Sequence, residues 1–241
     1  MKLDVVAIAP HPDDVELHCG GLMIRLADLG YKTGIIDMSR GEMSTRGTVK
    51  ERTLETEKAS DILGLTYRIN LELPDARLGV SETHRETLID SIRMLRPNFL
   101  LVPHKVARHP DHEATFRLGW EAAFLAGLEK IKTGHPAFRP NQVIFYFTHH
   151  TYKDQIPSFI VDITSTFDRK ITAIKTYCSQ FHKPDSVEPE TFISRPEFLN
   201  DIEIQSRYYG SLIGKAYGEP FFIREYLSVN DPIAFLSAQS G

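Results

Sequence analysis

The sequence predicts an α/β fold in which a mostly parallel sheet carries helices on both faces. In the first half of the chain, short apolar runs alternate with stretches whose apolar residues recur at helical spacing. The runs are continuously apolar, which is typical of strands buried on both faces of a parallel sheet. A length of 241 residues, 41% of them hydrophobic, is enough to bury one large core, so we expect a single domain over residues 1–241.

The elements of the first half follow in a regular order. Leu3 to Ala9 is an apolar run closed by Pro10, which predicts a strand, and the helical spacing that begins at Val15 ends before Gly30. Further strands are expected at Thr33–Met38, Tyr67–Leu73 and Phe99–Val102, and further helices at Val49–Leu63, Glu82–Leu95 and Asp111–Gly127.

The remaining chain is less regular. We expect strands at Val143–Phe147 and Phe159–Asp162, helices at Phe167–Cys178 and Asp201–Tyr209, and a Pro- and Glu-rich loop at Lys183–Pro196. The sequence contains no linker, internal repeat or low-complexity tract. We therefore expect the C-terminal third to decorate the sheet or to cover a site within the same domain.

Composition excludes several classes of protein. A net charge of −4 provides no basic surface for a phosphate backbone, so we expect no nucleic-acid partner. Cys19 and Cys178 are the only cysteines, which excludes a disulfide framework or a Cys-rich zinc module and fits a reducing compartment. The first apolar run is too short for a membrane span and unlike a signal peptide. We expect a cytoplasmic protein with no membrane partner, and we also expect a homo-oligomer.

Two His/Asp motifs follow the first and the fourth predicted strands. They are His11-Pro12-Asp13-Asp14 and His109-Pro110-Asp111-His112. In the common strand order of a doubly wound sheet these two strands are neighbours, and ligands bind beyond their carboxyl ends. We therefore expect the two motifs to meet.

The motifs together offer two imidazoles and a carboxylate, a set that catalytic zinc sites use while keeping a fourth position open for water. We predict Zn²⁺ ligands at His11, Asp14 and His112. Amide hydrolysis also needs a proton acceptor, and Asp13 is the candidate. His109 is the candidate for stabilising an oxyanion or protonating the leaving nitrogen, with Asp111 orienting an imidazole.

Each motif alone has a simpler interpretation. An H-x-D or D-D sequence beside a helix is commonly a cap or a solvated turn, and Asp111 is explained equally well as an N-cap. Two such clusters at the ends of neighbouring strands are hard to explain as independent caps. Other candidates are weaker. His18 and Cys19 are interpreted as packing residues, and His149 and His150 would point to opposite faces of a strand.

The chain resembles the PIG-L/LmbE-like family of zinc-dependent N-deacetylases over essentially its whole length. The similarity rests on Ala9 to Asp14, on the Gly20-Gly21 pair and on the motif that ends at His112. The chain looks closest to the bacillithiol-biosynthesis branch, through the less specific stretches Ser39-Arg40-Gly41-Glu42, Leu73-Pro74-Asp75, Tyr209-Gly210 to Ile213-Gly214, and Tyr217 to Phe221.

The resemblance implies a Rossmann-like fold, zinc at His11, Asp14 and His112, Asp13 as general base, and His109 in transition-state stabilisation. It also implies that Arg52 and Asp75 contact the sugar of an N-acetylated amino-sugar conjugate. Many members have Glu directly after the two aspartates, whereas this chain has Val15, so we assign no role to that position. The branch's substrate is N-acetylglucosaminyl malate, which is cleaved to acetate and glucosaminyl malate.

A group of cationic residues bears on the substrate. Arg40, Arg46, Arg52, Lys105 and Arg108 all lie in loops or helix starts expected around the metal. Such a group in an acidic protein favours a substrate that carries carboxylates, and we predict that Arg40 and Arg108 bind it.

Two alternative functions stay open. The first is deacetylation of another N-acetylated sugar, such as a chitobiose-like or natural-product glycoside. The second is a non-catalytic sugar- or metal-binding protein on the same fold, which the presence of both Asp13 and His109 disfavours.

Overall fold

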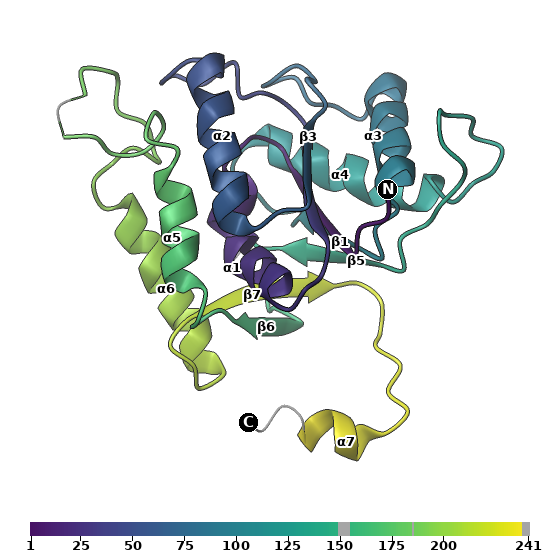
Figure 1. The fold of residues 1–241 in the computed structure, drawn as a ribbon. Helices are drawn as coiled ribbons and strands as arrows, with labels where there is room; N and C mark the ends of the chain where they lie inside the picture. The colour runs from purple at the N-terminus through teal and green to yellow at the C-terminus, as the bar shows by residue number, and fades with distance from the viewer. Residues whose placement is uncertain (149–154, 185, 238–241) are drawn as a thin grey trace.

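The computed structural model describes residues 1–148, 155–184 and 186–237. Within these residues the elements, in chain order, are β1 (Val5–Ala9), α1 (Asp14–Asp28), β2 (Thr33–Asp37), α2 (Val49–Leu63), β3 (Tyr67–Asn70), α3 (Glu82–Leu95), β4 (Phe99–Pro103), α4 (Pro110–Leu125), β5 (Gln142–Tyr146), β6 (Phe159–Asp162), α5 (Phe167–Lys175), α6 (Phe198–Leu212), β7 (Gly218–Ile223) and α7 (Pro232–Ser237). Figure 1 shows them as one sheet surrounded by helices, with α7 standing apart from the body.

The sheet has the strand order β3-β2-β1-β4-β5-β7-β6. The first five strands of this order are parallel, and β7 is antiparallel to both of its neighbours. β1 and β4 are adjacent, with Val5 opposite Phe99 and Ala7 opposite Leu101. From this pair the chain winds outward in both directions, through β2 and β3 on one side and through β5 on the other. The β1–β4 pair is therefore the switch point of the sheet.

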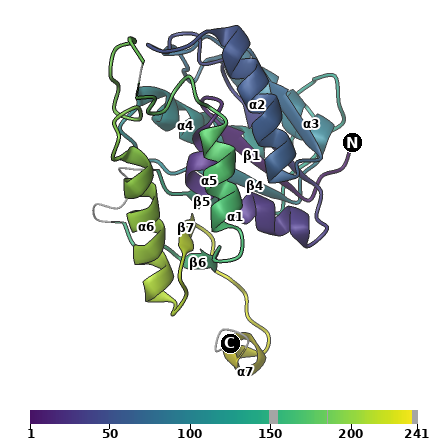
Figure 2. The same cartoon turned by 60° about the vertical axis from the view of Figure 1, so that its left-hand side comes forward.

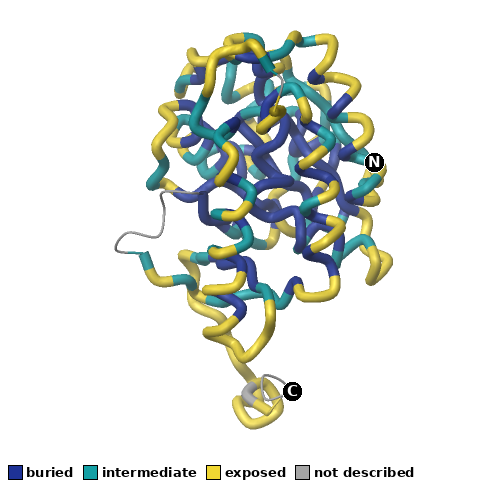
Figure 3. Tube along the Cα trace, turned by 90° about the vertical axis from the view of Figure 1, so that its left-hand side faces the viewer, coloured by how far each residue is buried: buried dark blue, intermediate teal, exposed yellow. Residues whose placement is uncertain are grey.

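Helices cover both faces of the sheet (Figure 2). On one face, buried residues of α3 and α4 pack against Val6, Ile8 and Val102. On the other face, α1 packs against Val5 and Ala7, and α2, α5 and α6 extend this layer. Figure 3 shows buried positions concentrated along the centre of the body. None of the described helices combines the length and apolarity that a bilayer crossing requires.

These observations confirm the predicted α/β class with a mostly parallel sheet. The predicted helices Val49–Leu63 and Glu82–Leu95 have the expected bounds. The strand expected at Tyr67–Leu73 ends at Asn70, because Glu72 turns the chain with a φ of 53°. β7 and α7 were not predicted, and Pro220 lies inside β7, where a proline argues against a strand. His149 and His150 lie outside the described residues.

The helix α1, which begins at Asp14, is broken in its middle, and a residue of β7 binds at this break. Cys19 has non-helical angles (φ −143°, ψ 19°). The carboxylate of Glu219, on β7, accepts hydrogen bonds from the backbone N–H groups of Gly21 and Leu22 at 2.9 and 2.7 Å. Lys170 donates to the same carboxylate at 2.7 Å, so the buried charge is balanced. The second half of α1 is thus capped by a residue from a distant strand.

The two glycines of this break should respond differently to an added methyl group. A Cβ on Gly21 would lie 2.9 Å from Cβ of buried Ile163, whereas the nearest atom to a Cβ on Gly20 would be 3.5 Å away. We expect Gly21→Ala to lower the free energy of unfolding by about 1–3 kcal/mol through overpacking. Gly20→Ala, the matched control, should leave it nearly unchanged. Denaturant unfolding followed by circular dichroism measures both, and equal effects would contradict the packing argument.

Candidate metal centre

The parallel pairing of β1 and β4 brings the two His/Asp motifs together. The first motif follows β1 and leads into α1, which begins at Asp14. The second precedes α4, with His109 as its N-cap and Pro110 in the first turn, where a proline is favoured. The expected meeting of the motifs is therefore present in the structure.

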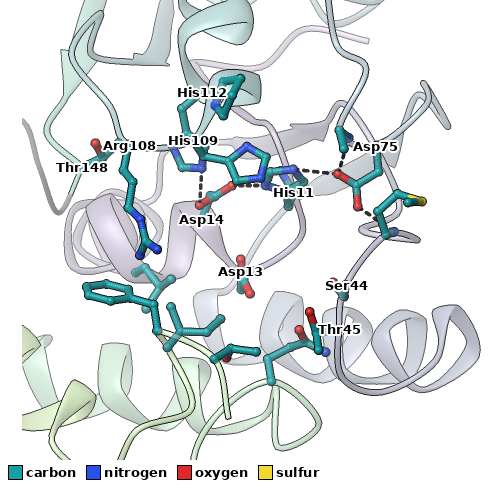
Figure 4. A pocket seen from close by; sticks show the side chains of 18 of the residues that line it. His11, Asp13, Asp14, Ser44, Thr45, Asp75, Arg108, His109, His112 and Thr148 are labelled. Atoms are coloured by element: carbon teal, nitrogen blue, oxygen red, sulfur yellow. Dashed lines mark hydrogen bonds and ion pairs between the residues drawn. The ribbon is translucent and has the colours of Figure 1, made fainter. Parts of the chain in front are cut away.

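Asp14 lies between two imidazoles (Figure 4). Its Oδ2 is 3.2 Å from Nδ1 of His11, and its Oδ1 is 3.2 Å from Nε2 of His112. The side chains of all three are at most 13% exposed. Burial alone would raise the pKa of Asp14, but the charges of His112 and His11 hold this pKa well below its usual range. The Asp14 carboxylate therefore stays ionised.

The arrangement of His11, Asp14 and His112 fits a zinc ion. One potential ligand atom from each residue lies within 4.8 Å of the others. In a tetrahedral site with ligands at about 2.0–2.1 Å, the ligand atoms are about 3.3 Å apart. Each imidazole lies 3.2 Å from one oxygen of the Asp14 carboxylate, His11 from Oδ2 and His112 from Oδ1, so both rings are within about this distance of the carboxylate. Two nitrogens and one carboxylate are also the donor set of known catalytic zinc sites.

A second group of potential ligand atoms shares His11. It consists of His11, His109 and Asp111. In this group Nδ1 of His109 already accepts a hydrogen bond from the backbone N–H of Asp111 at 3.2 Å. His109 is also exposed, whereas Asp14 and His112 are buried. We therefore assign the metal to the first group.

Two further carboxylates contact Nε2 of His11, the ring nitrogen that does not contact Asp14. Nε2 lies 3.0 Å from Oδ1 of Asp75 and 3.3 Å from Oδ2 of Asp111. Burial would lower the pKa of His11, but hydrogen bonds to Asp111, Asp14 and Asp75 raise it well above its usual range. A carboxylate on the outer nitrogen is the usual way to orient a metal-binding histidine. Asp111 thus contacts an imidazole, as expected, and that imidazole belongs to His11.

Asp75 is fixed by the backbone as well as by His11. Its carboxylate accepts hydrogen bonds from the N–H groups of Met43 and Ala76. Burial opposes ionisation of Asp75, but His11 and these N–H groups lower its pKa. The residue lines the cavity beside the metal centre. The structure therefore places Asp75 where it orients His11. The sugar contact that the resemblance implies for Asp75 stays a prediction.

Asp13 differs from the neighbouring Asp14. It is 4% exposed, and burial raises its pKa to about 7 although Arg52 opposes the shift. Its Oδ2 accepts a hydrogen bond from Nη2 of Arg52 at 2.6 Å. The backbone of Asp13 has φ 108° and ψ −25°, so its side chain does not cap α1. The carboxylate lies apart from the three metal-ligand candidates and faces the cavity (Figure 4).

The His109 ring lies beside the metal-ligand candidates, with its centroid 4.9 Å from that of His11 and 5.9 Å from that of His112. Because Nδ1 accepts a hydrogen bond from the backbone of Asp111, the neutral ring carries its proton on Nε2. Although the residue is partly exposed, desolvation of the ring and the charges of His11 and His112 lower the pKa of His109, which favours this neutral form. The ring can therefore donate a hydrogen bond from Nε2.

A cavity of about 490 Å³ opens over these residues. Its far wall includes Thr191, Phe192 and Ile193, which lie in the loop expected at Lys183–Pro196. His18, interpreted as a packing residue, also lines the cavity and lies 3.9 Å from Oδ1 of Asp14. The general expectation that the C-terminal third covers a site did not name the loop residues that do so, and the place of His18 beside Asp14 was not predicted. The apolar pair Phe192-Ile193 inside a polar loop was the available signal for the first.

The structure separates the five cationic residues that were expected around the metal. Arg108 and Arg52 line the cavity, whereas Arg40 lies in a second cavity and is 3.9 Å from Glu72. Arg46 is buried and donates to Ser186. Lys105 is exposed and is not among the described residues that line the cavity. Of the five cationic residues, Arg108 and Arg52 are therefore the ones placed at the cavity among the described residues. The guanidinium of Arg108 lies 4.7 Å from the ring centroid of Phe192.

The chain is similar to known proteins in both its sequence and its structure. A family model described as GlcNAc-PI de-N-acetylase (PIG-L) matches residues 6–123. The chain is 30% identical over 234 residues to the diacetylchitobiose deacetylase of Thermococcus kodakarensis, covering 89% of this chain and 80% of the relative. Its structure is similar to that of the conserved protein TT1542 from Thermus thermophilus, with a TM-score of 0.85, 38% identity, and coverage of 95% and 98%.

A third relative has a different activity in its name. The chain is 26% identical over 191 residues to the 4-oxalmesaconate hydratase of Pseudomonas putida, covering 73% of this chain and 74% of the relative. The similarities therefore support the deacetylase resemblance, but they do not single out the bacillithiol branch, which stays a prediction.

Removal of a metal ligand should abolish tight zinc binding. We expect about one zinc per chain in the intact protein and little in His112→Ala, because two ligands cannot replace the three-ligand set. Metal analysis after dialysis measures the zinc content. His135→Ala, which removes a surface histidine paired with Asp90, should keep the metal. Stoichiometric zinc of unchanged affinity in His112→Ala would show that the assigned site is wrong.

Proposed function

Because the chain belongs to the GlcNAc-PI de-N-acetylase (PIG-L) family, we propose that it is a zinc-dependent hydrolase that removes the acetyl group from the nitrogen of an N-acetylglucosaminyl conjugate. The observation that carries this proposal is the convergence of His11, Asp14 and His112 beside a cavity. Asp13 and His109, which line the same cavity, supply the groups that hydrolysis of an amide needs.

Each residue has a role in this reaction. His11, Asp14 and His112 would hold the zinc, which supplies Lewis-acid activation of water and of the amide carbonyl. Asp13 takes a proton from the attacking water, and the carbonyl carbon gains the oxygen of that water. His109 donates from Nε2 to the developing oxyanion. When the C–N bond breaks, Asp13 returns the proton to the leaving nitrogen, so the products are acetate and a free amine.

Within this class, N-acetylglucosaminyl malate is the proposed substrate. The branch-like stretches in the sequence support it, and so does the exposed guanidinium of Arg108 at the cavity, which can pair with a carboxylate. Diacetylchitobiose is the second candidate, because a relative that is 30% identical is a diacetylchitobiose deacetylase. The two substrates differ in the charge of the group attached to the N-acetylglucosamine.

Release of acetate tests the reaction itself. Zinc-loaded protein should release acetate from N-acetylglucosaminyl conjugates, whereas hydration of a double bond would release none. Asp13→Ala and His109→Ala should keep zinc and lose turnover by about 10²–10⁴-fold, because both groups act in the transition state. Coupled detection of acetate gives kcat and KM. Near-normal turnover of either variant would remove that residue from the mechanism.

A comparison of charged and neutral substrates tests the proposed aglycone. Arg108→Gln should raise KM for N-acetylglucosaminyl malate about tenfold, which corresponds to about 1.4 kcal/mol. It should leave KM for diacetylchitobiose unchanged, since that substrate has no carboxylate. Added salt should also narrow the preference of the unaltered protein for the malate conjugate. Arg117→Gln, on an exposed position of α4, is the control. Equal efficiency on both substrates at all salt concentrations would favour diacetylchitobiose.

A further inference from the structure

We infer that Arg52 is a positioning residue that holds Asp13 in the geometry needed by a general base. The inference rests on the proposed function, because it takes Asp13 as that base. It differs from the role that the family resemblance implies for Arg52, which is contact with the sugar. The geometry around the guanidinium favours the first role.

The guanidinium of Arg52 donates hydrogen bonds both to the backbone of the turn before α1 and to the side chain of Asp13 in that turn. Nε and Nη2 both donate to the carbonyl oxygen of Pro12. Nη2 also donates to Oδ2 of Asp13 at 2.6 Å. Both side chains of the ion pair are 6% exposed, so water does not compete effectively for these bonds. Arg52 therefore fixes the position of Asp13 through both its backbone and its carboxylate.

The turn at Pro12 and Asp13, which accepts these hydrogen bonds, is strained. Asp13 has a φ of 108°, a value that residues with a Cβ rarely adopt. Aspartate tolerates positive φ better than most residues, but its carboxylate makes no cap hydrogen bond to α1 that would stabilise the turn locally. The surrounding structure must hold this conformation. Among the described residues, the ion-pair partner of Asp13 is Arg52.

The donors of Arg52 are almost all used by the protein. A guanidinium has five N–H groups in a fixed fork. Nε uses one and Nη2 uses two on Pro12 and Asp13, while Nη1 donates one to Oγ of Ser44 at 2.8 Å. One N–H, on Nη1, is left without a partner within the described residues. A substrate can gain at most one hydrogen bond from Arg52.

The position of Arg52 is itself fixed by the start of α2. Thr48 and Glu51 form a capping box at this helix terminus, and the backbone N–H of Arg52 donates to the carbonyl of Thr48. Gly41, at a φ of 69°, allows the close approach, since a Cβ there would lie 3.2 Å from Nη1. The guanidinium is thus held before any substrate binds.

This arrangement leaves one oxygen of the base for the reaction. Oδ2 of Asp13 is engaged by Arg52, so Oδ1 is the oxygen that can accept the proton of water. Displacement of such a group by about 1 Å can lower a rate about 10²-fold. Loss of the guanidinium should therefore reduce kcat while KM changes little.

The kinetic test uses acetate release with Arg52→Gln, Arg52→Lys and Asp13→Ala, alone and combined. We expect Arg52→Gln to keep zinc and to lower kcat about 10²-fold. Arg52→Lys should recover part of the loss, because an ammonium can reach one of the two partners. Arg52→Gln should have little further effect in the Asp13→Ala background, because Arg52 acts through Asp13. A rise in KM with kcat retained, or losses that multiply in the double variant, would overturn the inference.

A second test does not depend on activity. Asp13→Gly removes the backbone strain and the carboxylate, so Arg52→Gln should lower Tm less in the Asp13→Gly background than in the unaltered protein. Arg93→Gln is the matched control. It removes a buried arginine that donates to the carbonyls of Ala126 and Leu128, and its effect on Tm should be equal in both backgrounds. Equal shifts for Arg52→Gln would overturn the inference.

Failure of the proposed function is separable from failure of this inference. Absence of acetate release by the zinc-loaded protein, or full turnover of Asp13→Ala, would contradict the proposed function, and the Tm comparison would then still show whether Arg52 holds Asp13 in its conformation. Loss of turnover in Asp13→Ala, together with an Arg52→Gln effect confined to KM, would contradict this inference alone.

Discussion

The parallel pairing of β1 with β4 is the constraint on which the rest of the site depends. In a parallel sheet the carboxyl ends of adjacent strands lie at the same edge, and at this pair the chain departs in opposite directions. The loops after both strands must therefore share the space above them. Each loop ends at the start of a helix, α1 or α4, and the partial positive charge of these helix ends favours carboxylates there. The sheet determines that the motifs meet, and the helix termini determine which charges they can hold.

Asp13 and Asp14 are adjacent in the chain, but their pKa values are shifted in opposite directions because their side chains have different neighbours. Asp14 accepts contacts from two imidazoles, and its pKa is held low, whereas burial raises the pKa of Asp13 to about 7 despite the charge of Arg52. Such separation of neighbouring carboxylates is how one site provides a permanent anion and a group that can exchange a proton. The left-handed turn at Asp13 produces the difference, since it directs the two side chains to different partners.

The elements from β1 to β6 and the residues that follow β1 and β4 could be predicted from the sequence, because apolar periodicity and strand ends are local properties. Features that depend on tertiary packing could not be predicted from the sequence. The contact of Asp75 with His11 joins loops 64 residues apart in the chain, and no spacing rule predicts it. β7 was obscured by Pro220 and Gly218, which lie outside the stretch Phe221–Ile223 that pairs with β5 and have a neighbouring strand, β6, on one side. Arg40 was expected near the metal from its place after β2, but its side chain lies in the second cavity beside Glu72.

The proposed chemistry comes from one part of the chain, whereas the cavity wall that can affect specificity is shared between Arg108 and a loop in another part. The family model matches residues 6–123, and this range contains all of the proposed ligands together with Asp13, His109 and Arg52. The opposite wall of the cavity includes Phe192 and Ile193, which lie beyond that range. The sheet fixes the first group, whereas the second belongs to a loop whose sequence can change without disturbing the β1–β4 pair. Relatives that share the metal ligands can therefore act on different substrates. The residues that discriminate among N-acetylated sugars are to be sought in the loop around Phe192 and in Arg108, which packs against it.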